Sequence, residues 1–189
     1  MIAGLSIIDL AAADLPSAAH VFAAAIPDAF DKEGLGHLQA DIQAEVEQKE
    51  RMLAASLAPA AETHFLVAKL QGTVVGTVSV GQCNEDIRRC AGSQLHSVVE
   101  LGSLYVLPGH QDQGIGSALI GAMMIHLTRS GVTQFCLDSG FRRAQQRWLR
   151  KFGAPFVVAK DYWGAGSDHI VWLCQVADFI SGSGEPHWG

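Results

Sequence analysis

The chain has 189 residues, of which 49% are hydrophobic and 17% charged, and its formal net charge is −6 at pH 7. This length and composition suit one globular domain with a substantial core and exclude a fibrous or disordered protein. The acidic balance disfavours nucleic acid as a partner and agrees weakly with a cationic substrate.

Hydrophobic periodicity and turn residues predict the following elements in chain order. They are a strand over 3–10, helices over 14–26 and 38–57, strands over 63–70, 74–82 and 97–107, a helix over 115–129, a strand over 132–139, a helix over 142–153, and strands over 155–160 and 169–176. Residues 84–95 are expected to form a loop. The acids of the helix over 38–57 form either a solvated face or a lip that attracts a cationic substrate.

Targeting signals and cysteine motifs narrow the expected cellular setting. The first residues lack a cationic region and include Asp9 and Asp14, unlike a secretory signal, and no apolar run is long enough to span a bilayer. The four cysteines form no C-x-x-C pair and stand mostly in apolar runs. We therefore expect a cytoplasmic protein without a metal site, a disulfide framework or a membrane partner.

The stretch HQDQGIGSAL, residues 110–119, joins the strand over 97–107 to the helix over 115–129. A strand, a glycine loop and a helix N-terminus form an anion site, because the first helical amides lack partners and the macrodipole leaves them partly positive. A P-loop needs a lysine after its last glycine, and none follows Gly116. A dinucleotide-binding loop needs a third glycine, and Leu119 stands at that position.

Gln111, Gly114 and Gly116 make the pattern Q-x-x-G-x-G directly after the strand residues LYVLP. This combination resembles the pyrophosphate-binding signature of the GNAT family of N-acetyltransferases, and the predicted element order is also that of the family. The resemblance implies an α/β (α+β) fold with a mixed, mostly antiparallel seven-stranded sheet, splayed at strands 4 and 5 and flanked by four helices. We expect this domain over 1–180 and a flexible tail over 181–189.

The resemblance also implies that acetyl-coenzyme A is the cosubstrate. Backbone amides of the glycine loop would bind its pyrophosphate, with the Gln111 side chain as a neutral amide donor. The backbone of the strand would pair with the pantetheine arm, and an amide there would polarise the thioester carbonyl, as in an oxyanion hole. The residues implied are Leu104, Val106, Gln111, Gln113, Gly114, Ile115, Gly116 and Ser117.

Acetyl transfer to an amine needs a base, because an alkylammonium has a pKa of about 10.4. Glu100 is the leading candidate, since it precedes Tyr105 by five residues in the strand beside the acetyl group. The alternative is a carboxylate held by a neighbouring strand or by solvent. His169 next to Asp168 is a second candidate, although adjacent strand residues point to opposite faces.

The sequence indicates no single residue as the proton donor to the leaving thiolate. Family members often carry a tyrosine in a phrase like FYEKLG, and the matching phrase here is WLRKFG, with Leu149 at the tyrosine position. Tyr105 or Tyr162 could substitute, or each is a packed aromatic residue. A thiol of pKa about 8.5 leaves largely as the thiolate without a strong acid.

Two charged features surround the predicted coenzyme loop. The basic helix over 142–153 either is solvated or contacts the 3'-phosphate of the coenzyme. Asp112 stands where relatives often have glycine, which predicts a positive φ. Its carboxylate is expected to face solvent beside bound coenzyme and to cap the empty helix.

The sequence thus predicts transfer of an acetyl group from acetyl-coenzyme A directly to a primary amine of a small molecule or peptide, in a ternary complex. No cysteine stands where an acyl-enzyme is expected. The alternative is a non-catalytic acyl-coenzyme A-binding sensor or regulatory module of the same fold. Edge strands could pair across a homodimer, and the sequence does not identify the acceptor.

Overall fold

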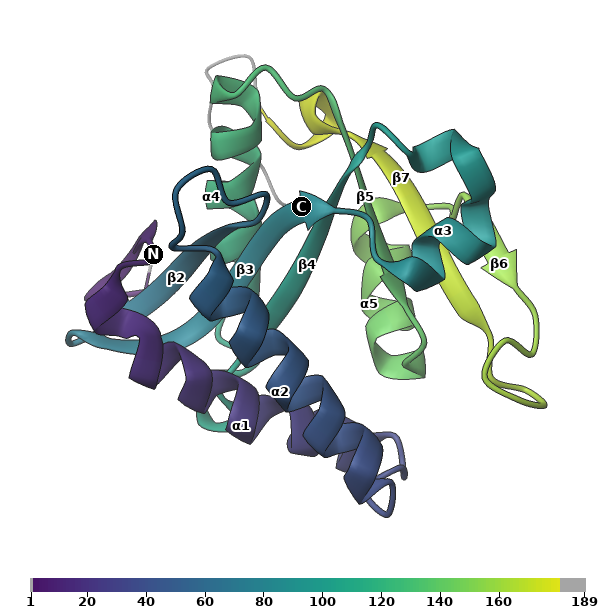
Figure 1. Cartoon of the computed structure of the whole chain (residues 1–189), viewed down its shortest axis with the longest axis horizontal. Helices are drawn as coiled ribbons and strands as arrows, with labels where there is room; N and C mark the ends of the chain where they lie inside the picture. Colours follow the sequence, from purple (N-terminus) through teal and green to yellow (C-terminus); the bar gives the residue numbers. More distant parts are fainter. Residues whose placement is uncertain (1, 181–189) are drawn as a thin grey trace.

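The computed structural model describes residues 2–180, so the tail expected over 181–189 lies outside the described residues. A seven-stranded sheet runs through the molecule in the order β1-β2-β3-β4-β5-β7-β6 (Figure 1). Its strands are β1 (Leu5–Asp9), β2 (His64–Leu70), β3 (Thr73–Gln82), β4 (Val99–Val106), β5 (Gln134–Ser139), β6 (Val157–Ala159) and β7 (His169–Gln175). All neighbouring pairs are antiparallel except β4 and β5, which are parallel. The predicted mixed, mostly antiparallel sheet is confirmed.

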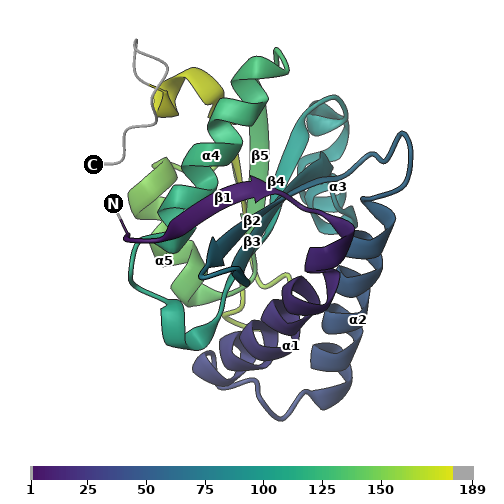
Figure 2. The same cartoon turned by 90° about the vertical axis from the view of Figure 1, so that its left-hand side faces the viewer.

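Helices cover both faces of this sheet. They are α1 (Leu15–Lys32), α2 (Gln39–Ala55), α3 (Glu85–Ala91), α4 (Ile115–Arg129) and α5 (Arg142–Phe152). Helices α1, α2 and α3 lie on one face, and α4 and α5 lie on the other (Figure 2). No helix within residues 2–180 is long and apolar enough to cross a membrane.

The prediction of four flanking helices was wrong, because α3 forms inside the segment expected to be a loop. Asn84 caps this helix, and its side-chain oxygen accepts a hydrogen bond from the Ile87 N–H at 2.9 Å. Glu85 and Asp86 then stand in the first turn, where the helix dipole favours negative charge. Ile87 and Ala91 are buried against β5 and β7. Seven residues are too few for a clear hydrophobic period, but the helix cap and the first-turn acids can be recognised in the sequence.

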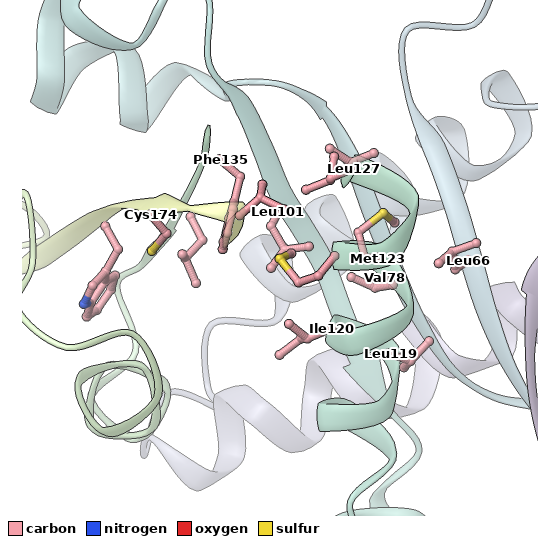
Figure 3. Close-up of a cluster of buried hydrophobic side chains, with 14 of the residues drawn as sticks. Leu66, Val78, Leu101, Leu119, Ile120, Met123, Leu127, Phe135 and Cys174 are labelled. Carbon is pink, nitrogen blue, oxygen red and sulfur yellow. The ribbon is translucent and has the colours of Figure 1, made fainter. Parts of the chain in front are cut away.

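Helix α4 anchors the largest hydrophobic cluster. Leu119, Met123 and Leu127 are at most 1% exposed and pack against strand side chains such as Val78 and Leu101 (Figure 3). Truncation of one such side chain to alanine generally costs about 2–5 kcal/mol. This packing fixes the helix N-terminus, and the loop before it, relative to β4.

Strands β4 and β5 separate soon after they meet. They pair only at Val99 with Phe135 and at Glu100 with Cys136, whereas β4 continues beside β3 to Val106. The predicted splay between strands 4 and 5 is therefore confirmed. Beyond Glu100, no strand formed by residues 2–180 pairs with this edge of β4.

A bulge bends β4 within this open part. Thr77 pairs with Tyr105 and Ser79 with Gly102, so two residues of β4 lie opposite one residue of β3. Ser103 in the bulge has φ of 47°, and its carbonyl accepts a hydrogen bond from the Thr77 hydroxyl at 2.8 Å. The hydrogen bond stabilises a backbone conformation that non-glycine residues seldom adopt.

The C-terminal end of α1 meets the N-terminal end of α5 across the parted strands. The Glu33 carboxylate accepts hydrogen bonds from the backbone N–H groups of Arg142 at 3.2 Å and Arg143 at 2.9 Å. Phe30 and Phe141 pack edge to face with ring centroids 5.0 Å apart. A carboxylate at a helix N-terminus accepts hydrogen bonds from unpaired amides and interacts favourably with the helix dipole. This contact therefore joins the two halves of the sheet.

Candidate active site

The open edge of β4 contains Leu104 and Val106, whose backbone groups the sequence predicts to bind the coenzyme. The N–H of Leu107 donates to the carbonyl of Val75 at 2.9 Å, so the backbone groups of Leu107 point toward β3. In an antiparallel pair, every second residue of a strand turns its backbone groups toward the same neighbour. Tyr105 therefore also turns its backbone groups toward β3, and Val106 turns its groups toward the open edge, where its carbonyl accepts a hydrogen bond from the Gln111 side chain at 3.1 Å. An extended ligand placed there can pair with β4 as an added strand.

The glycine loop leads into α4 with an open backbone. Gly114 is the N-cap of α4 with φ of 87°, and no side chain caps the helix there. Apart from the adjoining backbone, no atom of residues 2–180 lies within 4 Å of the positions that a Cβ would take at Gly114 and Gly116. Ile115 is 1% exposed and holds the first turn in the core, while the Gln113 side chain folds back to the carbonyl of Gly109 at 3.1 Å. Uncapped amides at an accessible helix N-terminus fit a pyrophosphate group.

The Gln111 side chain is bound within the protein. Its Nε2 donates to the carbonyl of Val106 at 3.1 Å and to Asp28 at 3.3 Å, and its Oε1 accepts from Lys32 at 2.7 Å. The predicted neutral amide therefore ties the loop to α1 and to the end of β4 in this structure.

Asp112 has the predicted backbone conformation but not the predicted partner. Its φ is 58°, as expected for a position where glycine is common. The carboxylate does not cap α4; it accepts a hydrogen bond from Arg147 of α5 at 3.2 Å and is 80% exposed. The expectation that it caps the empty helix was wrong, because the guanidinium offers a charged donor on the solvent side of the loop.

Two basic side chains of α5 lie against the glycine loop. Arg147 reaches Asp112, and Lys151, one turn later, donates from Nζ to the Ser117 hydroxyl at 3.0 Å. Burial lowers the pKa of Lys151. Both cations of this helix therefore lie beside the loop that is expected to bind the pyrophosphate, and the Arg147 side chain is 54% exposed.

Glu100 lies where β4 and β5 part. One carboxylate oxygen accepts from the Asn84 N–H at 2.6 Å, and the other accepts from the Asn84 side-chain amide at 3.2 Å. Burial, and after it the negative charge of Asp138, raise the pKa of Glu100 to about 7 against the opposing effects of the Asn84 donors and Lys49. A carboxylate with a pKa near neutrality suits a general base at physiological pH.

Gly102 provides the space for this carboxylate. A Cβ at Gly102 would lie 2.8 Å from Oε1 of Glu100. The absence of a side chain at this position therefore allows Glu100 to lie along the strand.

A polar network extends from Glu100 across β5 to β7. The Asn84 side-chain amide also donates to Asp138 at 3.0 Å, and the same carboxylate oxygen lies 2.9 Å from Nε2 of His169. The Trp163 indole N–H donates to Nδ1 of His169 at 3.0 Å, which places the ring proton on Nε2, toward Asp138. His169 is 3% exposed, and both ring nitrogens are engaged. It therefore holds Asp138, and proton abstraction from an acceptor by His169 would require this network to open.

Asp168 does not belong to this network. It binds Lys160 at 2.7 Å and the backbone N–H of Asp161 at 3.0 Å. Strand alternation turns it away from His169, so the partner of the imidazole is Asp138. The sequence analysis missed Asn84 and Asp138. Cys136 pairs with Glu100, and Asp138 follows Cys136 by two residues, so Asp138 lies on the same face of the sheet as Glu100.

The tyrosines suggested as proton donors are bound to acids on helices. The Tyr105 hydroxyl donates to Glu45 at 3.2 Å, and burial raises its pKa well above the usual value. The Tyr162 hydroxyl donates to Asp86 of α3 at 2.7 Å. Leu149, at the usual tyrosine position, is 43% exposed. Among the described residues, no group of His, Cys, Asp or Glu is arranged to hold a metal ion.

Comparisons with known proteins agree with this arrangement of fold and site. A model of the Acetyltransferase (GNAT) family matches residues 32–154. The chain belongs to this family, and it is accordingly an acetyltransferase. Comparison with curated proteins by sequence gave no match.

Several solved structures share the fold. A GNAT-family protein from Desulfovibrio desulfuricans has a TM-score of 0.68 and 17% identity, over 91% of this chain and 99% of that one. PaiA N-acetyltransferase from Thermoplasma acidophilum, solved with coenzyme A, has a TM-score of 0.62 and 17% identity, over 90% and 98%. The ribosomal-protein-S18-alanine N-acetyltransferase of Escherichia coli has a TM-score of 0.60 and 17% identity, over 91% and 94%.

Proposed function

We propose that the protein transfers the acetyl group of acetyl-coenzyme A directly to a primary amine of a small molecule or peptide, in a complex that holds both substrates. The observation that carries this proposal is the end of β4–β5 pairing at Glu100. Among the described residues, no strand pairs with this edge of β4, which lies next to the open N-terminus of α4 and carries a half-buried carboxylate at its start.

The coenzyme site is assigned to the glycine loop and the open edge of β4. The N–H groups of residues 113–117 would bind the pyrophosphate, and the backbone of Leu104 and Val106 would pair with the pantetheine arm. Arg147 and Lys151 lie close enough to the loop to contact phosphate oxygens. When bound, the coenzyme supplies a thioester with an electrophilic carbonyl carbon. The T. acidophilum neighbour, solved with coenzyme A, supports this assignment of the ligand.

Glu100 is the proposed general base. The acceptor arrives as an ammonium ion of pKa about 10.4, and Glu100 accepts one proton from it directly or through water. Because this carboxyl group has a pKa of about 7, its base form dominates above that pH. We expect the ionisation of Glu100 to make kcat/KM rise with pH up to about 7 and to contribute no further increase above that pH.

Backbone amides and a tyrosine complete the proposed chemistry. An amide on the open edge of β4 stabilises the oxyanion that develops on the thioester carbonyl. Tyr105 stays protonated because its pKa is raised, so it can donate a proton to the leaving thiolate if its hydroxyl turns away from Glu45. His169 is proposed to act through Asp138 and Asn84.

The cysteines support direct transfer without an acyl-enzyme. The contact with the Cys83 sulfur, together with burial, raises the pKa of the Cys136 thiol, and burial raises the pKa of Cys174 to about 12. The same contact lowers the pKa of Cys83, which is buried and points its sulfur toward the carbonyls of Leu95 and Val98. A protonated, buried thiol such as Cys136 or Cys174 is a poor nucleophile.

The test is release of free thiol from acetyl-coenzyme A with a panel of small amines, polyamines, aminoglycosides and peptide N-termini, beside a thermal-shift measurement of coenzyme binding. Amine-dependent thiol release together with binding supports the proposal. Binding without turnover on any amine would favour the alternative, a sensor or regulatory module. Failure to bind coenzyme would contradict both.

A further inference from the structure

Two carboxylates on adjacent strands meet at the point where β4 and β5 part. Glu100 is level with Cys136 in the parallel ladder, and Asp138 follows Cys136 by two residues on the same face of β5. One amide group, that of Asn84, donates to both carboxylates, at 3.2 Å to Glu100 and 3.0 Å to Asp138. Like charges this close raise the free energy of the doubly ionised state.

Hydrogen bonds from two side chains hold the Asp138 carboxylate in place. It accepts hydrogen bonds at a single oxygen from Nε2 of His169 and from Asn84, and the Trp163 donor fixes the imidazole tautomer. Glu100 and Asp138 are both half-buried, and the Asp138 side chain is 16% exposed. These contacts fix the Asp138 carboxylate beside Glu100.

Other titratable groups face this pair from each neighbouring element. Helix α2 contributes Lys49 and Glu45, which pair with each other at 3.5 Å, so the charge of Lys49 is shared. The remaining groups are Tyr105 on β4, Cys83 at the end of β3, Cys136 on β5, His169 on β7 and Arg88 on α3. The fixed charge with the strongest effect on Glu100 is Asp138.

We propose that Asp138 is a positioning residue for acetyl transfer that acts through Glu100, and that Asn84 and His169 hold the two carboxylates in register. This inference rests on the proposed role of Glu100. When Glu100 accepts a proton from the acceptor ammonium, the N–H bond breaks, an O–H bond forms on Glu100, and the pair changes from two negative charges to one. The repulsion between the carboxylates is relieved in that step, so Asp138 strengthens the base.

The direct test is titration of Glu100 in the ligand-free protein, followed by NMR of carbon-13 in the glutamate side-chain carboxyl groups. The signal lost in Glu100→Gln identifies the group. We expect it to titrate near pH 7 in the wild type and about one pH unit lower in Asp138→Asn, whose side chain keeps the shape and the acceptor oxygen. Asp168→Asn is the matched control, since that carboxylate binds Lys160, and it should leave the Glu100 titration unchanged.

Asn84→Ser provides a second variant with a shift of opposite sign. Serine keeps a helix-capping oxygen and the backbone N–H, but it lacks the amide that bridges the two carboxylates. Loss of this donor should raise the pH at which Glu100 titrates. A general loosening of the site would not move the two variants in opposite directions. If neither variant shifts the Glu100 titration, or if both shift it the same way, the proposal is wrong.

The pH profile of kcat/KM then links the titration to the reaction. Its acid limb should move to lower pH in Asp138→Asn, and the plateau should fall about threefold because a weaker base removes the proton more slowly. A lower plateau with an unmoved limb would overturn the positioning role. Absence of turnover in the wild type would contradict the proposed function, whereas the NMR titration would still decide whether Asp138 controls Glu100.

Discussion

The two sides of the open β4 strand are built from different parts of the chain. On the coenzyme side, the segment from Leu104 to Ser117 provides most of the proposed contacts, mainly through backbone groups, and α5 adds Arg147 and Lys151. On the Glu100 side, the polar network uses side chains from β4, β5, β7, the cap of α3 and the loop before β7. Binding by backbone groups depends on the conformation of the loop, whereas the side-chain network depends on the charges of its residues. Substitutions on the two sides should therefore change different kinetic constants.

The largest effect is expected from Glu100→Gln. Removal of a general base generally lowers the rate by about 10²- to 10⁴-fold, and the fall should appear in kcat at neutral pH. The Kd for acetyl-coenzyme A, measured by calorimetry, should stay within a factor of two, since Glu100 lies outside the glycine loop. Glu47→Gln, an exposed acid on α2, is the matched control. Retention of activity with an unchanged pH profile would remove Glu100 as the base.

Gly114→Ala should affect the coenzyme side of β4. The φ of 87° at this position is unfavourable for any residue with a Cβ, by roughly 1–2 kcal/mol. A methyl group would also stand beside the amides of the helix N-terminus. We expect the Kd for acetyl-coenzyme A to rise about 10-fold with little change in kcat. Gly109→Ala is the control, because that position also has open space but lacks a positive φ; equal effects of the two would contradict this explanation.

Gly102→Ala tests the side-chain network without removing a polar group. The new Cβ would lie 2.8 Å from Oε1 of Glu100, so the flexible carboxylate must move while the strand stays folded. We expect kcat to fall about fivefold, the loss of a fraction of the general-base contribution. Combined with Glu100→Gln, the substitution should cause no further loss, since both act on one group. Additive losses would show that Gly102 acts in another way.

The smallest effect is expected from Asp112→Gly. The change removes one exposed carboxylate beside the proposed pyrophosphate site and frees Arg147 from its ion pair. An exposed charge contributes about 1 kcal/mol or less, so the KM for acetyl-coenzyme A should fall about twofold, as seen in initial-rate measurements. Arg147→Gln should have the opposite effect on KM. A large rise in KM with Asp112→Gly would mean that the aspartate stabilises the loop.

The sequence could predict what is encoded within short stretches of chain. The bounds of α4 agree with its apolar pattern, and the positive φ at Asp112 follows from a position where glycine is common. The bond from Asp112 to Arg147 was missed because the partner comes from another helix. Likewise Asn84 and Asp138 lie 54 residues apart along the chain and meet only when the sheet forms. Side-chain orientation in such a network depends on tertiary packing, which leaves no local pattern.

The contact of Glu33 with the start of α5 gives the site a mechanical property. Helix α1 packs on β3 and β4, and α5 packs on β5 and β7, so the half-sheets are joined at Glu100 and again at Glu33. The parted strands are thus linked at both ends of the gap between them. We expect these contacts to limit the relative movement of the half-sheets, and a site that moves little loses little conformational entropy when a ligand binds.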